Sequence, residues 1–473
     1  MLFCSKSYLL FFLVVFAVYW ALPWRRPRVG LLLAASFYFY ASWSQRLAAI
    51  VCVSSLIDYL VARGMDATDR PRRRRILLGL SLAMNLGLLV YFKYANFFLR
   101  SLEDALTALG ATASLPVLKV ILPIGISFYT FEAINYTIDV YRRRIPAEKN
   151  LSHFMLFMLF FPHLIAGPIV RARDFLPQIS RAKRWDWGRL NVGIQFFLLG
   201  LFKKLAIADR MALFVDPVFS APEQYNTGAL WAATLAWALQ VYCDFSGYSD
   251  MALGSAHMLG YKLAKNFDLP YMAPNIAEFW RRWHISLSSW LRDYLYFPLG
   301  GSRCTRWKTS RNLLVVMTLG GLWHGASWPY VMFGVLQGVL LSVHREFREF
   351  CQSRPGLKWF SQTSPGTSLR IAVTFTTFCL TLVVFRAPTL SAGFEMLAHM
   401  FSRHAGSGLP LAIVGLWVTA LVVFAGNVST HLGWWRPLAA APSPVRGFTY
   451  ALALSLALVL NPGADKAFIY FQF

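Results

Sequence analysis

The sequence predicts an all-α protein that crosses a membrane about ten to twelve times and has no separate soluble domain. Hydrophobic residues make up 57% of the 473 residues, charged residues make up 14%, and the mean hydropathy is +0.47. A soluble chain of this length has no single core large enough to bury so much apolar surface. The apolar residues also fall in long runs, and a helix of ~20 apolar residues crosses ~30 Å of hydrocarbon.

The clearest apolar runs are predicted to be spanning helices, and the basic loops between them indicate their orientation. The runs cover roughly 7–23, 29–43, 47–63, 76–99, 115–139, 189–215, 228–258, 371–387, 411–427 and 447–462. Arginines cluster after the first, third and fifth runs, in the loops 24–28, 70–75 and 142–144. Loops rich in Lys and Arg stay on the cytoplasmic side. We therefore expect a multi-pass membrane protein whose N-terminus lies outside the cytoplasm.

The charge and the cysteines exclude several other classes of protein. The 46 Lys and Arg residues outnumber the 22 Asp and Glu residues, and the formal net charge is +24. Because the basic residues lie in short loops between apolar runs, membrane orientation explains them better than nucleic-acid binding does. The six cysteines form no CxxC pair and no zinc spacing, so we predict no metal site and no disulfide framework.

The apolar run 151–170 does not fit a simple crossing. The loops before and after it are both basic, so one crossing would place one of them on the wrong side. Pro162, Gly167 and Pro168 also interrupt a helix here. We favour a re-entrant segment whose irregular backbone is buried in protein. A plain crossing with one misplaced basic loop remains the alternative.

The run 312–342 shows the same conflict. It has basic loops on both sides and is shorter than the ~40 residues that two crossings need. Gly325 and Pro329 lie in its middle, so the run is predicted to enter the membrane, break and return, with His324 near its deepest point. The G-x-x-x-G spacing at 334–338 is interpreted as packing within the chain rather than as a dimer face.

The window 278–303, EFWRRWHISLSSWLRDYLYFPLGGSR, mixes charged and aromatic residues. It is too polar to face lipid and too aromatic for a free loop, so we expect it at the interface or beside a polar cavity. If the window is helical, Glu278 can pair with Arg282 four residues later. The same spacing would place His284 and Ser288 on one face.

Polar residues also interrupt the apolar run at 240–254, QVYCDFSGYSDMALG. Gln240, Asp244 and Asp250 lie within one predicted span, where carboxylates need polar partners. These residues either line a cavity or support Arg281 or Arg282, and we favour support. The chain has no G-x-S-x-G elbow, no P-loop and no dinucleotide-binding glycine motif.

His324 is the strongest catalytic candidate because of its setting, GLWHGASW. Titratable groups at membrane depth are costly, and they indicate function by default. An imidazole with its ordinary pKa of ~6.5 is a competent general base at neutral pH. Burial among Trp323 and Trp328 would favour its neutral form. The alternative is a core histidine that is hydrogen-bonded to a carbonyl freed by the helix break.

Several long windows resemble the membrane-bound O-acyltransferase (MBOAT) family, and in particular its bacterial branch that acetylates exopolysaccharides such as alginate. The pair EFWRRWHISLSSWLRDYLYFPLGGSR and GGLWHGASW looks like the family signature. Four other stretches look like the same branch: ILPIGISFYTFEAINYTIDVYR, FFPHLIAGPIVRARDFLPQI, CDFSGYSDMALG and the ending FIYFQF. The resemblance covers residues 1–473, and the core signature region covers about 121–345. It implies a single membrane domain with re-entrant segments around a central tunnel. It also implies that the membrane is the bacterial inner membrane, so that the N-terminus would be periplasmic.

The resemblance also implies residue roles. The family histidine of the W-H-G motif corresponds to His324, which would be catalytic, and a second family position, His or Asn, corresponds to His284. Arg281, Arg282 and Arg303 are candidate contacts for the phosphates of a donor, and Ser288 and Trp323 are further candidates for substrate binding. Glu278, Asp244, Asp250 and Gln240 would give polar support.

The implied activity is transfer of an acetyl group from a cytoplasmic donor, such as acetyl-CoA, to a periplasmic acetyltransferase partner. A polysaccharide would be the indirect acceptor, membrane lipid would surround the protein, and no cofactor would stay bound. D-alanyl or other acyl transfer to a cell-envelope polymer is the first alternative. A transporter or flippase is the second, since broken helices at membrane depth also occur in transporters. We find no paired repeats, which transporters often have.

Overall fold

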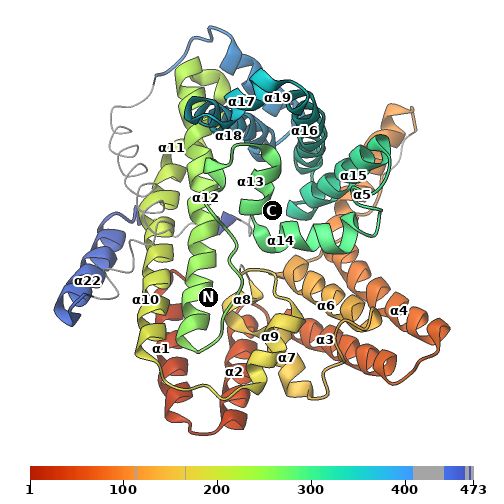
Figure 1. Cartoon of the computed structure of the whole chain (residues 1–473), viewed down its shortest axis with the longest axis vertical. Helices are drawn as coiled ribbons and strands as arrows, with labels where there is room; N and C mark the ends of the chain where they lie inside the picture. The colour runs from red at the N-terminus through yellow and green to blue at the C-terminus, as the bar shows by residue number, and fades with distance from the viewer. Residues whose placement is uncertain (112–113, 166, 409–440, 464–467, 470–473) are drawn as a thin grey trace. The chain divides into compact units, whose positions relative to one another are not determined.

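The computed structural model describes residues 1–111, 114–165, 167–408, 441–463 and 468–469, and within these its regular structure is helical (Figure 1). No strand occurs in these ranges, where β pairing is limited to an isolated bridge between Tyr225 and Ser407. The all-α prediction is therefore confirmed. The chain forms two compact units, one of residues 1–193 and 252–264 and the other of residues 194–251 and 265–473. The single membrane domain stays a prediction.

The first unit begins with helices at the predicted apolar runs. Its helices are α1 (Lys6–Ala21), α2 (Arg25–Ala41), α3 (Gln45–Asp66), α4 (Pro71–Leu89), the π-helical turn η1 (Val90–Tyr94), α5 (Ala95–Ala108), α6 (Ile126–Tyr141), α7 (Leu151–Leu159), α8 (Phe161–Leu164) and α9 (Ala172–Ser180). Ser5 and Ser44 cap α1 and α3 by accepting a backbone N–H. Such caps satisfy donors that a helix start leaves open.

The predicted span 115–139 is wrong in its first part. The helix in this region, α6, begins only at Ile126, and residues 114–123 are not helical. Pro116 and Pro123 disfavour a helix before that point. Gly125 has a φ of 74°, and a Cβ there would lie 2.6 Å from the Leu164 carbonyl oxygen, so this position suits glycine alone.

The second unit holds most of the chemistry-bearing residues. Its elements are η2 (Lys203–Ala208), α11 (Asp209–Ser220), η3 (Pro222–Gln224), η4 (Pro270–Met272), α13 (Ile276–Arg282), α14 (Ile285–Leu291), η5 (Arg292–Tyr296), α15 (Arg306–His324), α16 (Trp328–Gln352), α17 (Pro355–Gln362), α18 (Ser364–Arg386), α19 (Leu390–Phe401) and α22 (Ser443–Val459). The boundary between the units falls inside α10 (Trp187–Phe202) and α12 (Thr227–Met258).

Several helices have the length and composition of membrane spans. Four helical stretches among the described residues are long and apolar enough to cross a membrane: Gln45–Asp66, Pro71–Ala108, Trp187–Ser220 and Ser364–Arg386. Two shorter apolar helices are α1 and α22. Together with the family comparison below, they make the chain a multi-pass membrane protein. The predicted span 411–427 lies outside the described residues.

The predicted break in 151–170 is present in the first unit. Helix α7 ends at Leu159, the short helix α8 follows, and residues 167–171 continue as buried, non-helical chain. The freed polar groups find partners inside the unit. Glu132 Oε1 lies 3.1 Å from His163 Nδ1 and accepts the Val170 N–H at 2.9 Å. Buried polar partners of this kind allow irregular backbone away from water.

The run 312–342 forms a helical hairpin, as the glycines and the proline in its middle predicted. Helix α15 ends at His324, and α16 begins at Trp328 and returns along it. Glycines make the close approach possible: a Cβ at Gly334 would lie 2.4 Å from the Met317 carbonyl oxygen, and one at Gly338 would lie 2.8 Å from Leu314 Cα. The G-x-x-x-G spacing thus packs within the chain, as expected.

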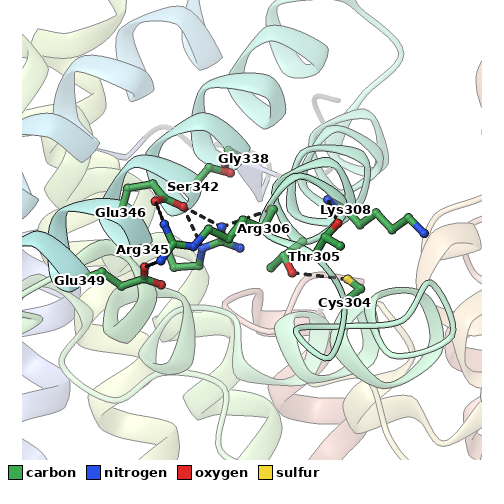
Figure 2. A network of polar contacts seen from close by, with 10 residues as sticks. Cys304, Thr305, Arg306, Lys308, Gly338, Ser342, Arg345, Glu346 and Glu349 are labelled. Carbon is green, nitrogen blue, oxygen red and sulfur yellow. Dashed lines mark hydrogen bonds and ion pairs between the residues drawn. The ribbon is translucent and has the colours of Figure 1, made fainter.

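Ion pairs join the two open ends of this hairpin (Figure 2). Arg306 at the start of α15 reaches Glu349 Oε2 at 2.7 Å near the end of α16, and it also lies 3.8 Å from Glu346. Arg345 donates to the carbonyl oxygen of Arg306 at 3.2 Å. Start and end of the segment therefore lie together, as a re-entrant segment requires. The side of the membrane that they face stays a prediction.

Cysteine labelling tests this topology. Ser310 in α15 and Ser353 after α16 are to be replaced by cysteine one at a time, in a chain that lacks the native cysteines. Because basic residues flank both positions, we expect an impermeant thiol reagent to label both only after the cytoplasmic face is opened. Labelling of either position from outside would mean that 312–342 makes a net crossing.

Candidate active site

His324 is the last residue of α15, and its side chain is buried in an aromatic enclosure. Its ring centroid lies 5.1 Å from that of Trp323, 5.3 Å from Phe385 on α18 and 6.3 Å from Phe333 on α16. The helix break puts the imidazole where three helices meet in the second unit. Water is largely excluded from it, since its residue is only 5% exposed.

The break after His324 depends on Gly325. Its backbone is extended, with φ −169°, which any residue can adopt. The restriction is steric, because a Cβ at this position would lie 2.2 Å from Cε2 of Tyr330. The Tyr330 ring packs in turn on Phe385, with centroids 4.8 Å apart. A larger residue at 325 would therefore push on one wall of the His324 enclosure.

We expect Gly325→Ala to destabilise the hairpin by ~1–3 kcal/mol, the usual cost of overpacking, and to lower activity with it. Thermal unfolding and acyl transfer of the purified variant are the measurements. The matched control is Gly356→Ala on α17, where a Cβ would meet nothing within 4 Å. Equal stability of the two variants would contradict the steric role of Gly325.

His284 lies between α13 and α14 in a left-handed backbone conformation, with φ 43° and ψ 53°. The window 278–303 is thus not one helix, and the prediction that His284 and Ser288 share a helix face is wrong. His284 precedes α14, and the Ser288 hydroxyl donates to the carbonyl oxygen of Trp283 at 3.1 Å. The turn points the His284 ring into the interior, where it is fully buried.

Asn266 fixes the orientation and the tautomer of His284. Asn266 Oδ1 accepts the Ser286 backbone N–H and the Ser286 hydroxyl at 3.2 and 2.9 Å, which identifies it as the amide oxygen. His284 Nδ1 lies 3.2 Å from the same oxygen. A nitrogen facing an acceptor must donate, so Nδ1 carries the proton. In the neutral ring the lone pair is then on Nε2.

Trp323 connects the two histidines. Its ring centroid lies 5.5 Å from that of His284 and 5.1 Å from that of His324, and the side chain is buried. Phe245 on α12 packs edge-on against His284 at 4.6 Å. The structure therefore brings together the two predicted histidines and the predicted Trp323 in one apolar cluster.

The predicted donor contacts lie outside this cluster. Arg281 and Arg282 both bond to Glu278, at 3.1 Å each, which confirms the predicted pairing of Glu278 with Arg282. Partial burial opposes ionisation of Glu278, but the hydrogen bonds from Arg282 and Arg281 hold its pKa below the usual value. Arg281 remains 74% exposed at the side chain, and Arg303 is exposed in a turn. Both can reach an anionic group from solvent.

The predicted support of Arg281 or Arg282 by Asp244 and Asp250 is wrong. Asp244 Oδ1 lies 2.7 Å from Lys204 Nζ, and Asp250 Oδ2 lies 2.7 Å from Lys203 Nζ. The lysines lie in η2, and buried carboxylates take the nearest buried cations. Gln240 is buried on α12.

Two amide residues of the site were not predicted from the sequence. Asn266 lies in a non-helical stretch, 18 residues before its partner, so no periodicity relates them. Gln337 on α16 is fully buried, accepts the Trp280 indole N–H at 3.1 Å and donates to Thr381 Oγ1 at 2.8 Å. It links α13, α16 and α18. A lone amide inside an apolar run is the signal that could have indicated Gln337.

A groove of about 620 Å³ lies at the open end of the α15–α16 hairpin rather than at the histidines. It is lined by Ser310, Ser342, Val343, Glu346, Phe347 and Phe350. Among the described residues, no three His, Cys, Asp or Glu side chains lie close enough to hold a metal ion. The tunnel that the family resemblance implies stays a prediction.

Comparison with known proteins shows the family of the chain. The model of the MBOAT, membrane-bound O-acyltransferase family matches residues 117–385, which include both histidines. "Probable alginate O-acetylase AlgI" of Azotobacter vinelandii is 41% identical over 405 residues, 85% of this chain and 78% of the relative. "Peptidoglycan O-acetyltransferase" of Helicobacter pylori is 37% identical over 79% of this chain and 73% of its own length. "Teichoic acid D-alanyltransferase" of Streptococcus thermophilus is 29% identical over 55% and 68%.

Proposed function

The chain belongs to the membrane-bound O-acyltransferase family, and we propose that it supplies acetyl groups for the O-acetylation of a secreted, alginate-like polysaccharide. The names of its relatives are those of acyltransferases, and those with 37–41% identity are O-acetylases or O-acetyltransferases. The observation that carries the proposal is the buried pair of His324 and His284, which both contact Trp323.

His324 is proposed as the catalytic base. An acceptor hydroxyl would give its proton to the imidazole, and the oxygen would attack the carbonyl carbon of an acetyl thioester. The carbon–sulfur bond then breaks, and the thiolate takes the proton back from the imidazolium. The aromatic enclosure of His324 supports this role, since a site that excludes water protects the thioester from hydrolysis.

A covalent route uses the same residue. A ring nitrogen of His324 would attack the thioester, expel the thiolate and carry the acetyl group. The acceptor hydroxyl would then attack this acetyl group, the carbon–nitrogen bond would break, and the freed ring nitrogen would take the hydroxyl proton. In both routes His284 supports the reaction from the other side of Trp323. Its Nδ1–H is tied to Asn266, so Nε2 is the nitrogen that can accept a hydrogen bond in the neutral ring.

The donor and the partner are further parts of this proposal. We propose acetyl-CoA, an anionic thioester, as the cytoplasmic donor, and Arg281, Arg282 and Arg303 as contacts for its phosphates. The acetyl group would leave on the periplasmic side through a partner acetyltransferase. The basic loops support an inner-membrane protein with a periplasmic N-terminus.

Labelled donors separate the candidate functions. The purified chain in lipid vesicles is to be given acetyl-CoA labelled in the acetyl group. Acetyl bound to the chain, or transferred to a hydroxyl acceptor, supports the proposal. Movement of intact donor across the vesicle would indicate a carrier. Transfer of D-alanine but not acetate would favour the D-alanyl alternative, which the Streptococcus thermophilus relative makes worth testing.

A further inference from the structure

The second unit contains buried ion pairs that have no part in the proposed roles of the two histidines. Lys204 Nζ lies 2.8 Å from Asp209 Oδ1 and 2.7 Å from Asp244 Oδ1, and all three side chains are buried. Lys203 forms a separate pair with Asp250 at 2.7 Å. Both lysines come from the π-helical turn η2, a type of distortion that is frequent at functional sites. Burying charges is costly, and it does not by itself stabilise a fold.

Asp244 has a contact that Asp250 lacks among the described residues. Its Oδ2 accepts the backbone N–H of Ile469 at 2.8 Å, while its Oδ1 faces Lys204. The carboxylate therefore connects the ion pair to the C-terminal part of the chain. Phe468 and Ile469 are both buried there. A hydrogen bond to an ionised carboxylate is stronger than one to a neutral acceptor.

A series of aromatic ring contacts connects Phe468 to His284. The Phe468 centroid lies 4.2 Å from that of Tyr248 and 5.9 Å from that of Phe245. Phe245 in turn stands edge-on to His284, with centroids 4.6 Å apart and an interplanar angle of 84°. Phe245, which packs against His284, is thus itself packed against Phe468, a residue near the end of the chain.

We infer that Lys204 and Asp244 are positioning residues, which anchor Phe468 and Ile469 and thereby hold Phe245 against His284. Lys204 holds the Asp244 carboxylate in its orientation, and Asp209 gives the lysine its second partner. The inference rests on the proposed role of His284 in acyl transfer. The role of the Lys204–Asp244 ion pair would then be to position Phe468 and Ile469, which the sequence alone did not indicate.

The anchor is tested by thiol accessibility, which does not depend on acyl transfer. Ile469→Cys is to be made in the full chain with its six native cysteines replaced by alanine. With the ion pair intact we expect slow labelling of this cysteine. Asp244→Ala should raise the labelling rate about tenfold or more, the factor expected for loss of one charge-assisted hydrogen bond. The matched control is Asp250→Ala, which breaks the Lys203 pair and should change the rate less than about twofold.

Two outcomes of this experiment would overturn the anchor: unchanged protection in Asp244→Ala, or equal exposure in both variants. If Asp244→Ala does not fold, Asp244→Asn takes its place, since it keeps the size of the side chain and removes its charge. A neutral amide oxygen holds the Ile469 N–H less tightly than a carboxylate does, so the cysteine at position 469 should still be labelled faster. Unchanged protection in Asp244→Asn would overturn the anchor as well.

Kinetics test the link to His284. Phe468→Ala should lower kcat about ten- to a hundredfold, the cost of a misplaced group, with little change in KM for the donor. Phe468→Leu should recover part of the loss, which a purely global defect would not do. Full kcat in Phe468→Ala would contradict the positioning step. If the proposed function itself fails, no variant transfers acetyl, yet the labelling rates still report the anchor.

Discussion

His324→Ala is expected to lower acetyl transfer by ~10²–10⁴-fold, the usual contribution of a positioned general base, and by more if the acetyl group passes through the ring. The fold should survive, because the side chain packs in an aromatic enclosure of Trp323, Phe333 and Phe385 that remains intact. Transfer of labelled acetate by the purified variant, together with its membrane yield, gives the measurement.

His344→Ala is the matched control, since His344 lies on α16, away from the aromatic enclosure. We expect it to keep nearly full activity. Activity of His324→Ala close to that of this control would remove His324 from the mechanism. A labelled chain that loses its acetyl group to hydroxylamine, and is not labelled in His324→Ala, would favour the covalent route over the base.

The hairpin at His324 could be predicted because the signals were local. Gly325 and Pro329 interrupt an apolar run, and the basic residues on both sides favour a segment that returns to the side it came from. The structure adds what a one-dimensional pattern lacks, namely the contact of Arg306 with Glu349 at the open end. The predicted span 115–139 failed for the opposite reason. Its composition is apolar, but two prolines and the left-handed Gly125 prevent a helix before Ile126.

The candidate site residues that could be predicted are those whose type and setting indicate chemistry. Those that were missed make contacts between distant parts of the chain. His324, His284 and Trp323 were expected and lie together. Asp244 was assigned the wrong partner, because Lys204 lies inside an apolar run and only a π-helical turn directs it to α12. Asn266 is recognisable only once the left-handed turn at His284 has formed.

That left-handed turn complicates the usual alanine test of His284. A φ of 43° costs an ordinary L-residue roughly 1–2 kcal/mol, whereas glycine adopts it freely and asparagine adopts it more readily than alanine. His284→Ala therefore loses both the side chain and the backbone preference. His284→Gly loses the side chain without the backbone cost, so the two variants together separate the effects.

His284→Ala is expected to lower acyl transfer about 10²-fold or more, as loss of a group that supports proton transfer would, and His284→Gly should lower it equally if the side chain matters. His284→Asn should retain more activity, because an amide can donate to Asn266 Oδ1 and tolerates the left-handed backbone.

Asn266→Ala, which frees the imidazole from its Nδ1 partner, should lower kcat about 10–100-fold, the range for leaving a buried donor unsatisfied. Combined with His284→Asn it should cost less than the sum of the two single effects, since both remove the same contact. The kcat values of the four single variants and the double variant are the measurement. Equal and complete loss in His284→Asn and His284→Ala would instead mean that the His284 ring exchanges protons, a task that no amide performs.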